Sequence, residues 1–177
     1  MAAFGGRIIG AIKLDKNTYE EVEADERATG QAMGVVVLSA LASGIGMSGQ
    51  GSPGMVAGVL GALGGWVIAA LIIFVVGTKL LPEPQTKSNP GELLRTLGFA
   101  NAPGLLFVFG VIPGFTSIIQ TVVGIWVLAA WVIAVRQALD YDSTVRAVVV
   151  CVLGWLVFVG GLFLLAAVLG GVAGLAS

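Results

Sequence analysis

Residues 91–115, GELLRTLGFANAPGLLFVFGVIPGF, decide how the rest of the chain is arranged. The stretch begins with charged residues, becomes apolar at Leu97, and is interrupted at Pro103-Gly104 and again at Pro113-Gly114. Its apolar part, residues 97–112, is shorter than the roughly 20 residues that a helix needs to cross a membrane. If this stretch crosses the membrane, every later segment lies on the side opposite to where it would lie if the stretch turned back. The stretch therefore controls the topology.

The composition indicates that lipid is the main solvent of this chain. Hydrophobic residues make up 57% of the sequence and charged residues 11%, whereas a soluble domain carries about 25% charged residues. The net charge of −1 gives no reason to expect nucleic acid as a partner. The single cysteine, Cys151, excludes an intramolecular disulfide. We therefore expect membrane lipids, and a second membrane protein or another copy of the chain, as partners.

Hydropathy and turn residues predict an all-α integral membrane protein with five transmembrane helices and a short amphipathic N-terminal helix. In the amphipathic helix, Phe4, Ile8, Ile9 and Ile12 share one face, which predicts either a helix lying on the membrane or an arm packed on the bundle. The predicted parts are an amphipathic and acidic arm at 1–27, crossings at 28–47, 55–81, 97–112, 115–135 and 147–169, and a short tail at 170–177.

Small residues recur along the second predicted crossing. Gly54, Gly58 and Ala62 are spaced four residues apart, and so are Gly61 and Gly65. Such ridges let two helix backbones approach closely in lipid. The pattern fits both packing within the chain and dimerisation.

The basic residues predict the orientation. If all five segments cross and the N-terminus is cytoplasmic, the segments 1–27, 77–96 and 136–146 contain all nine basic residues and lie inside, as the positive-inside rule requires. The C-terminal tail then lies on the external side of the cell membrane. If residues 97–112 turn back instead, Arg136 and Arg146 move outside. The charge distribution therefore favours a crossing, with Arg95 reaching the membrane surface through its long side chain.

The residue types available argue against an enzyme. The chain has no histidine, and the five predicted crossings contain a single charged residue, Lys79 at the end of 55–81. No carboxylate pair, nucleophile–base arrangement or metal-ligand set is available, so we expect no cofactor and no metal. Asn101, just before Pro103, has two interpretations. Its amide could repair the broken helix, or it could form a ligand or permeation site.

The pattern resembles the Yip1 domain family, in its bacterial branch. The resemblance rests on the motif at 14–20, LDKNTYE, and on the third segment and its exit, at Gly98, Phe99, Asn101, Pro103 and Pro113. It implies a five-helix membrane fold without an established activity, and hence a non-enzymatic protein that binds partners or lipids, as an accessory or structural subunit. A channel or a lipid or solute carrier using the broken third helix is the alternative. The Asp-Leu-Tyr-Gly-Pro element of eukaryotic members, which bind prenylated Rab GTPases, is absent, so we do not transfer that role.

Overall fold

The computed structural model describes residues 3–48 and 54–175, with side chains as far as residue 168. This part of the chain contains helices and no strands. In order, the elements are α1 (Phe4–Ile12), α2 (Lys16–Ala24), α3 (Ala28–Gly46), α4 (Met55–Val75), the π-helical η2 (Val76–Leu80), α5 (Pro90–Phe99), the 3₁₀-helical η3 (Ala102–Val111), α6 (Thr116–Ala138) and α7 (Thr144–Leu175).

Five segments are long and apolar enough to cross a membrane, which confirms the predicted fold class. They are Ala28–Gly46, Met55–Leu80, Pro90–Val111, Thr116–Ala138 and Thr144–Val168. The third of these begins at Pro90 rather than near Leu97. Asn89 and Glu92 form a capping box at its start, because each side chain accepts the backbone N–H of the other residue.

The third segment gains length from its helix type as well as from its early start. A 3₁₀-helix rises about 2.0 Å per residue and an α-helix about 1.5 Å. Together α5 and η3 therefore extend about 35 Å, which exceeds the hydrocarbon core of about 30 Å. Pro103 stands at the start of η3, where its missing N–H costs no intrahelical hydrogen bond.

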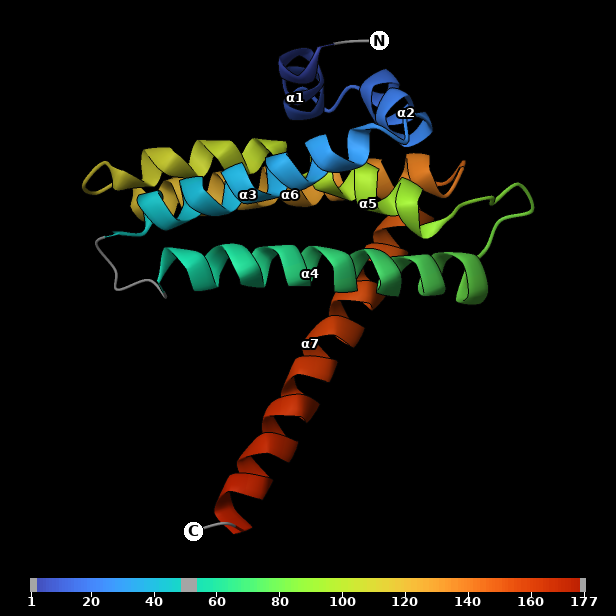
Figure 1. The fold of residues 1–177 in the computed structure, drawn as a ribbon. Helices are drawn as coiled ribbons and strands as arrows, with labels where there is room; N and C mark the ends of the chain where they lie inside the picture. The colour runs from blue at the N-terminus through green and yellow to red at the C-terminus, as the bar shows by residue number, and fades with distance from the viewer. Residues whose placement is uncertain (1–2, 49–53, 176–177) are drawn as a thin grey trace.

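The third segment runs beside α3 in the same direction and does not turn back. Three close approaches follow one another in the same order along both helices. They are Gly98 on Ala32, Gly104 on Ser39, and Gly110 on Gly46. In Figure 1 the chain then returns through α6. The approach at Gly98 needs a glycine, because an added Cβ there would lie 2.6 Å from the Cβ of Ala32.

The charged segments meet at one end of the bundle. The Tyr141 hydroxyl donates to the carbonyl oxygens of Gly77 (2.9 Å) and Leu81 (2.7 Å), and so caps the end of η2. The Gln137 amide on α6 donates to Glu20 on α2 (2.7 Å). Contacts of this kind join the arm to the segments around residues 77–96 and 136–146, so these three parts lie together.

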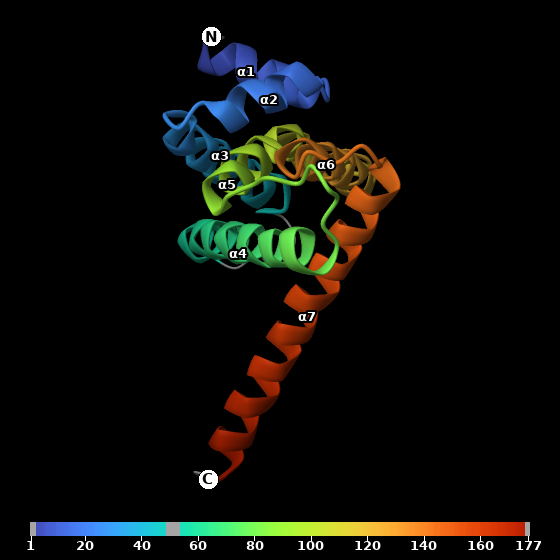
Figure 2. The same cartoon turned by 90° about the vertical axis from the view of Figure 1, so that its right-hand side faces the viewer.

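Figures 1 and 2 show the helices in layers, with α1 and α2 covering the face formed by α3, α5 and α6 and with α4 on the opposite face. The helix α1 packs Phe4, Ile8 and Ile12 on the bundle, which agrees with the second of the two interpretations above, whereas Ile9 is 55% exposed. The rings of Phe4 and Phe99 meet edge to face with centroids 6.4 Å apart. The Trp126 indole donates to the Ile12 carbonyl at 2.9 Å.

The last helix departs from the others. In both views α7 crosses α4 and then runs away from the bundle. Its first half packs on α4, where Gly154 lies against Ile73 and Phe158 reaches Gly65. Farther along, the side chains from Gly160 to Val168 are all exposed. One chain therefore leaves half of a long apolar helix without a protein neighbour among the described residues.

Candidate functional site

An apolar groove lies between α3, α4, α6 and the first half of α7. Its volume is about 1070 Å³. One wall is formed by α4 from Met55 to Ile73, and the opposite wall by α3 from Val36 to Met47. Residues of α6 and α7, including Cys151, complete the lining, and none of the lining residues carries a charge. The groove therefore suits an apolar occupant.

The glycine ridges of α4 lie at this groove only in part. Gly58, Ala62 and Gly65 line it, and an added Cβ on Gly54, Gly58 or Gly61 would meet no atom within 4 Å. Only Gly65 has a neighbour near its Cβ position, the Phe158 ring at 3.8 Å. At Gly54, Gly58 and Gly61 the described chain thus lacks the internal contacts that helix packing would give. Of the two interpretations of the ridges, contact with another molecule is the one that these three positions fit.

Two polar side chains of the groove lining, Asn101 and Trp66, donate hydrogen bonds to backbone carbonyls. The Asn101 side-chain amide donates to the Leu97 carbonyl (2.8 Å). The Asn101 backbone N–H donates to the Gly98 carbonyl three residues earlier (3.2 Å), as in a 3₁₀-helix. The side chain thus satisfies a carbonyl that the change of helix type leaves free. The Trp66 indole donates to the Leu94 carbonyl (3.0 Å). The Trp131 indole nitrogen is buried without a hydrogen-bond partner in the described part of the chain.

The other residues of the predicted motif have separate places. Gly98 and Phe99 are buried, the first against α3 and the second against Phe4 of α1. Pro103 is buried at the start of η3. Pro113 is exposed in the turn before α6, where Gly114 has a φ of +83°. The motif is therefore mainly a packing and turn motif, and Asn101 is its one member that lines the groove.

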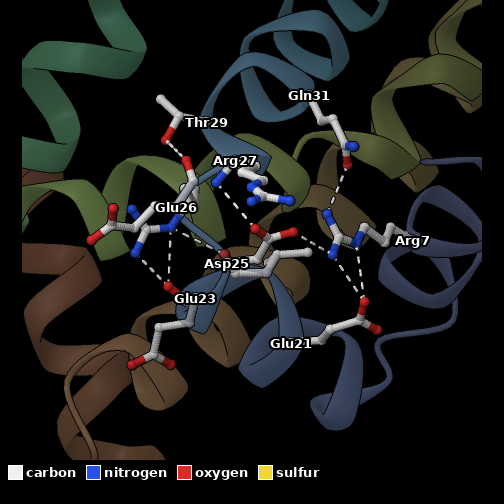
Figure 3. A network of polar contacts seen from close by, with 10 residues as sticks. Arg7, Glu21, Glu23, Asp25, Glu26, Arg27, Thr29 and Gln31 are labelled. Carbon is white, nitrogen blue, oxygen red and sulfur yellow. Dashed lines mark hydrogen bonds and ion pairs between the residues drawn. The ribbon is translucent and has the colours of Figure 1, made fainter. Parts of the chain in front are cut away.

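A buried arginine ties the N-terminal arm together. The Arg7 side chain is 2% exposed, and its guanidinium donates to Glu21 (2.9 Å), Asp25 (2.7 Å) and Gln31 (2.9 Å). Figure 3 shows Arg7 among these three acceptors, which come from α2, its C-terminal end and α3. The hydrogen bond from Arg7 holds the pKa of Asp25 below its usual value. Burial lowers the pKa of Arg7, but its bonds to Asp25 and Glu21 outweigh this and raise it.

The family model of the Yip1 domain matches residues 16–174. The chain belongs to the Yip1 domain family. Neither a curated protein nor a solved structure matches it. The matched stretch includes the groove and α7, whereas α1 with Arg7 precedes it. In this Yip1 domain the arginine therefore joins a helix outside the matched stretch to α2 and α3 inside it.

Arg95 is the second buried arginine of the Yip1 domain, and its position differs from the one expected. We expected its side chain to reach the membrane surface, but it is only 6% exposed. Its guanidinium donates to the backbone carbonyls of Val22 (3.1 Å) and Glu23 (3.0 Å) at the end of α2. These carbonyls have no partner within their own helix, and the positive charge suits that helix end. Arg95 thus fastens the arm to α5.

Glu23 lies beside Arg95 in an acidic part of the Yip1 domain. The pKa of Glu23 is raised from 4.5 to about 7, mainly by burial and also by the nearby Glu92, Asp140 and Glu20, against the effect of Arg95. The folded protein therefore binds a proton at Glu23 that the unfolded chain has already released at pH 6. Within the described residues, no group of acidic residues or cysteines has the arrangement of a metal site.

We expect this carboxyl to make the folded arm less stable as the pH rises. Between pH 4.5 and about 7 the unfolded chain binds fewer protons at Glu23 than the folded chain does, so this contribution falls with pH. Glu23→Gln removes it. Melting temperatures of the two proteins in detergent, measured from pH 4 upward, should diverge in favour of the variant as the pH increases. Parallel curves would contradict the assignment.

Sequence reasoning missed the two buried arginines because their partners are far apart in the chain. We expected Arg95 at the membrane surface from its residue type alone. Burial of an arginine requires acceptors, and the acceptors of Arg95 are backbone carbonyls on another helix, which the sequence does not mark. The Asn89-Pro90-Gly91-Glu92 run was a usable signal, since it has the spacing of a capping box and starts α5.

Proposed function

We propose that this Yip1 domain protein is a non-enzymatic, structural or accessory subunit that docks within the membrane against another protein chain. One observation carries the proposal: an uncharged groove and half of an apolar helix both lack a partner in the same chain. No enzymatic activity is known for the family. In lipid, helices associate by close packing of small residues, and Gly58, Ala62 and Gly65 offer such a surface.

The proposed setting is the inner membrane of a bacterium, with a cytoplasmic N-terminus and an external C-terminus. Two findings support this orientation. The arm contacts the charged segments around residues 77–96 and 136–146, and these parts contain every basic residue of the chain. Positive charge favours the cytoplasmic side. Five crossings then place the C-terminal tail outside.

Filling the groove tests the proposal. Gly58 and Ala62 line the groove, whereas Gly61 and Gly64 on the same helix do not, and an added Cβ on any of the three glycines meets no atom within 4 Å. We expect the wild type, extracted in mild detergent, to run as a complex larger than its 18.0 kDa chain. The double variant Gly58→Leu with Ala62→Leu should run at monomer size, and Gly61→Leu with Gly64→Leu should keep the complex. A wild type that runs alone contradicts the proposal.

A channel or a lipid or solute carrier is the alternative, and it is favoured by the position of Asn101 on the groove. The amide of Asn101 already bonds to Leu97, and loss of that bond leaves a buried carbonyl unsatisfied at a cost of about 1–3 kcal/mol. We therefore expect Asn101→Ala to lower the melting temperature and to leave flux in proteoliposomes at the background level. Wild-type flux that Asn101→Ala abolishes, with the melting temperature unchanged, would establish the alternative instead.

A further inference from the structure

We propose that the occupant of the groove is the second half of α7 from another copy of this chain, so that two copies exchange these helices. The inference rests on the proposed docking function and names the partner. Each copy has one unfilled groove and one free apolar helix half. An exchange between two copies fills both grooves and covers both helix halves.

The free half of α7 cannot fill the groove of its own chain. The helix is continuous from Thr144 to Leu175. Its first half is fixed on α4, where an added Cβ on Gly154 would lie 3.0 Å from Ile73 and where Phe158 meets Gly65. From Gly160 onward the helix continues away from the bundle (Figures 1 and 2). Folding back would require a break in this helix.

The groove and the free helix half match in length. The α4 wall from Met55 to Ile73 extends about 28 Å, and the end of α7 from Gly160 to Leu175 extends about 24 Å. The volume of about 1070 Å³ lies at the upper limit of pockets for small molecules, which hold roughly 300–1,000 Å³. An elongated groove of this size can bind one face of a helix.

Their chemistry also matches. Neither surface carries a charged side chain, so neither needs a charged partner. Gly160 and Gly161 have open space around their Cβ positions, as Gly58 does on α4. Phe163, Leu164 and Leu165 are more than half exposed and supply bulky side chains to fill the groove. Small residues on both helices permit the close backbone approach by which helices associate in lipid.

The membrane makes the exchange geometrically consistent. The 32 residues of α7 extend about 48 Å, longer than a hydrocarbon core of about 30 Å, so a spanning α7 is strongly tilted. The tilt carries its second half sideways, toward a neighbouring molecule. A twofold axis along the membrane normal brings two such helices across each other and keeps the charged ends of both copies on one side.

Disulfide formation between two differently tagged copies tests the exchange. One copy carries Ala62→Cys in the groove, and the other carries a single cysteine at one of the positions Leu164, Leu165, Ala166 or Ala167. Both copies carry Cys151→Ser. The four positions span one helical turn, so one of them faces the groove at any rotation of α7. Leu60→Cys replaces Ala62→Cys as the control, because Leu60 is 65% exposed and lies outside the groove lining.

After oxidation in native membranes we expect a mixed-tag dimer with Ala62→Cys at one or two of the four positions, and none with Leu60→Cys. Equal dimer yields from both, or no dimer at any position, would overturn the exchange. A third protein carries both cysteines in one chain. A disulfide that forms only within that chain would also overturn the exchange, since α7 would then occupy its own groove. A large complex that persists without the mixed-tag dimer would overturn the exchange and leave the docking function standing.

Discussion

Replacing Gly46 with alanine is expected to destabilise the fold by about 3 kcal/mol or more, the upper range for overpacking in a close-packed interior. The added Cβ would lie 2.0 Å from the carbonyl oxygen of Phe107. That oxygen belongs to the backbone of η3, so no rotation of a side chain can relieve the contact. The melting temperature in detergent and the yield of folded protein from membranes should both fall.

Gly44 provides the matched control two residues away on the same helix. An added Cβ at Gly44 meets no atom within 4 Å, so Gly44→Ala should leave the stability unchanged or raise it slightly, as alanine favours a helix over glycine. Similar melting temperatures for Gly46→Ala and the wild type would contradict the parallel packing of α3 against η3. They would also remove the main support for a third segment that extends along the whole of α3.

Replacing Arg7 with methionine is expected to release the N-terminal arm. The change removes the donors on which Glu21, Asp25 and Gln31 rely and leaves the buried Asp25 carboxylate without its cation. We expect the amides of α1 and α2 to exchange hydrogen at least about ten-fold faster, while the amides of α3 and α6 keep their protection.

Lys13→Met is the control for this change, since it removes the same charge from an exposed position at the end of α1. Arg7→Lys should restore only part of the protection, because an ammonium group lacks the planar, forked donors that reach several acceptors. If Lys13→Met loosened the arm as much as Arg7→Met, net charge rather than the buried network would hold the arm in place.

Much of the fold could be predicted from hydropathy, and the start of the third segment shows the limit of that method. Apolar length predicted five crossings, but it placed the third at Leu97 because the preceding residues are polar. In the folded chain Arg95 can be buried in the bundle because the end of α2 supplies hydrogen-bond acceptors for its guanidinium. Such tertiary acceptors can bury a residue type that a sequence pattern assigns to the surface.

The candidate site was less accessible to sequence reasoning. The four-residue spacing of Gly54, Gly58 and Ala62, and of Gly61 and Gly65, predicts that α4 packs on a neighbour. It does not predict which neighbour. That depends on the direction of α7, and an apolar run specifies a length rather than an angle. Asn101 was identified as a polar residue within the third segment, and its interpretation depended on the hydrogen bond to Leu97, which requires the 3₁₀ geometry of η3.

The most direct test of this account asks what fills the groove in a native membrane. A photo-crosslinking amino acid at Ala62, inside the groove, is compared with the same amino acid at Leu60, outside it. Because the first half of α7 lines the groove of its own chain, the informative adduct is one that joins two chains. After irradiation we expect a crosslinked dimer from Ala62, in which mass spectrometry identifies a peptide from the second half of α7, and only lipid adducts from Leu60. Lipid adducts alone at both positions would show that the groove is lined by lipid, and would contradict a docking role.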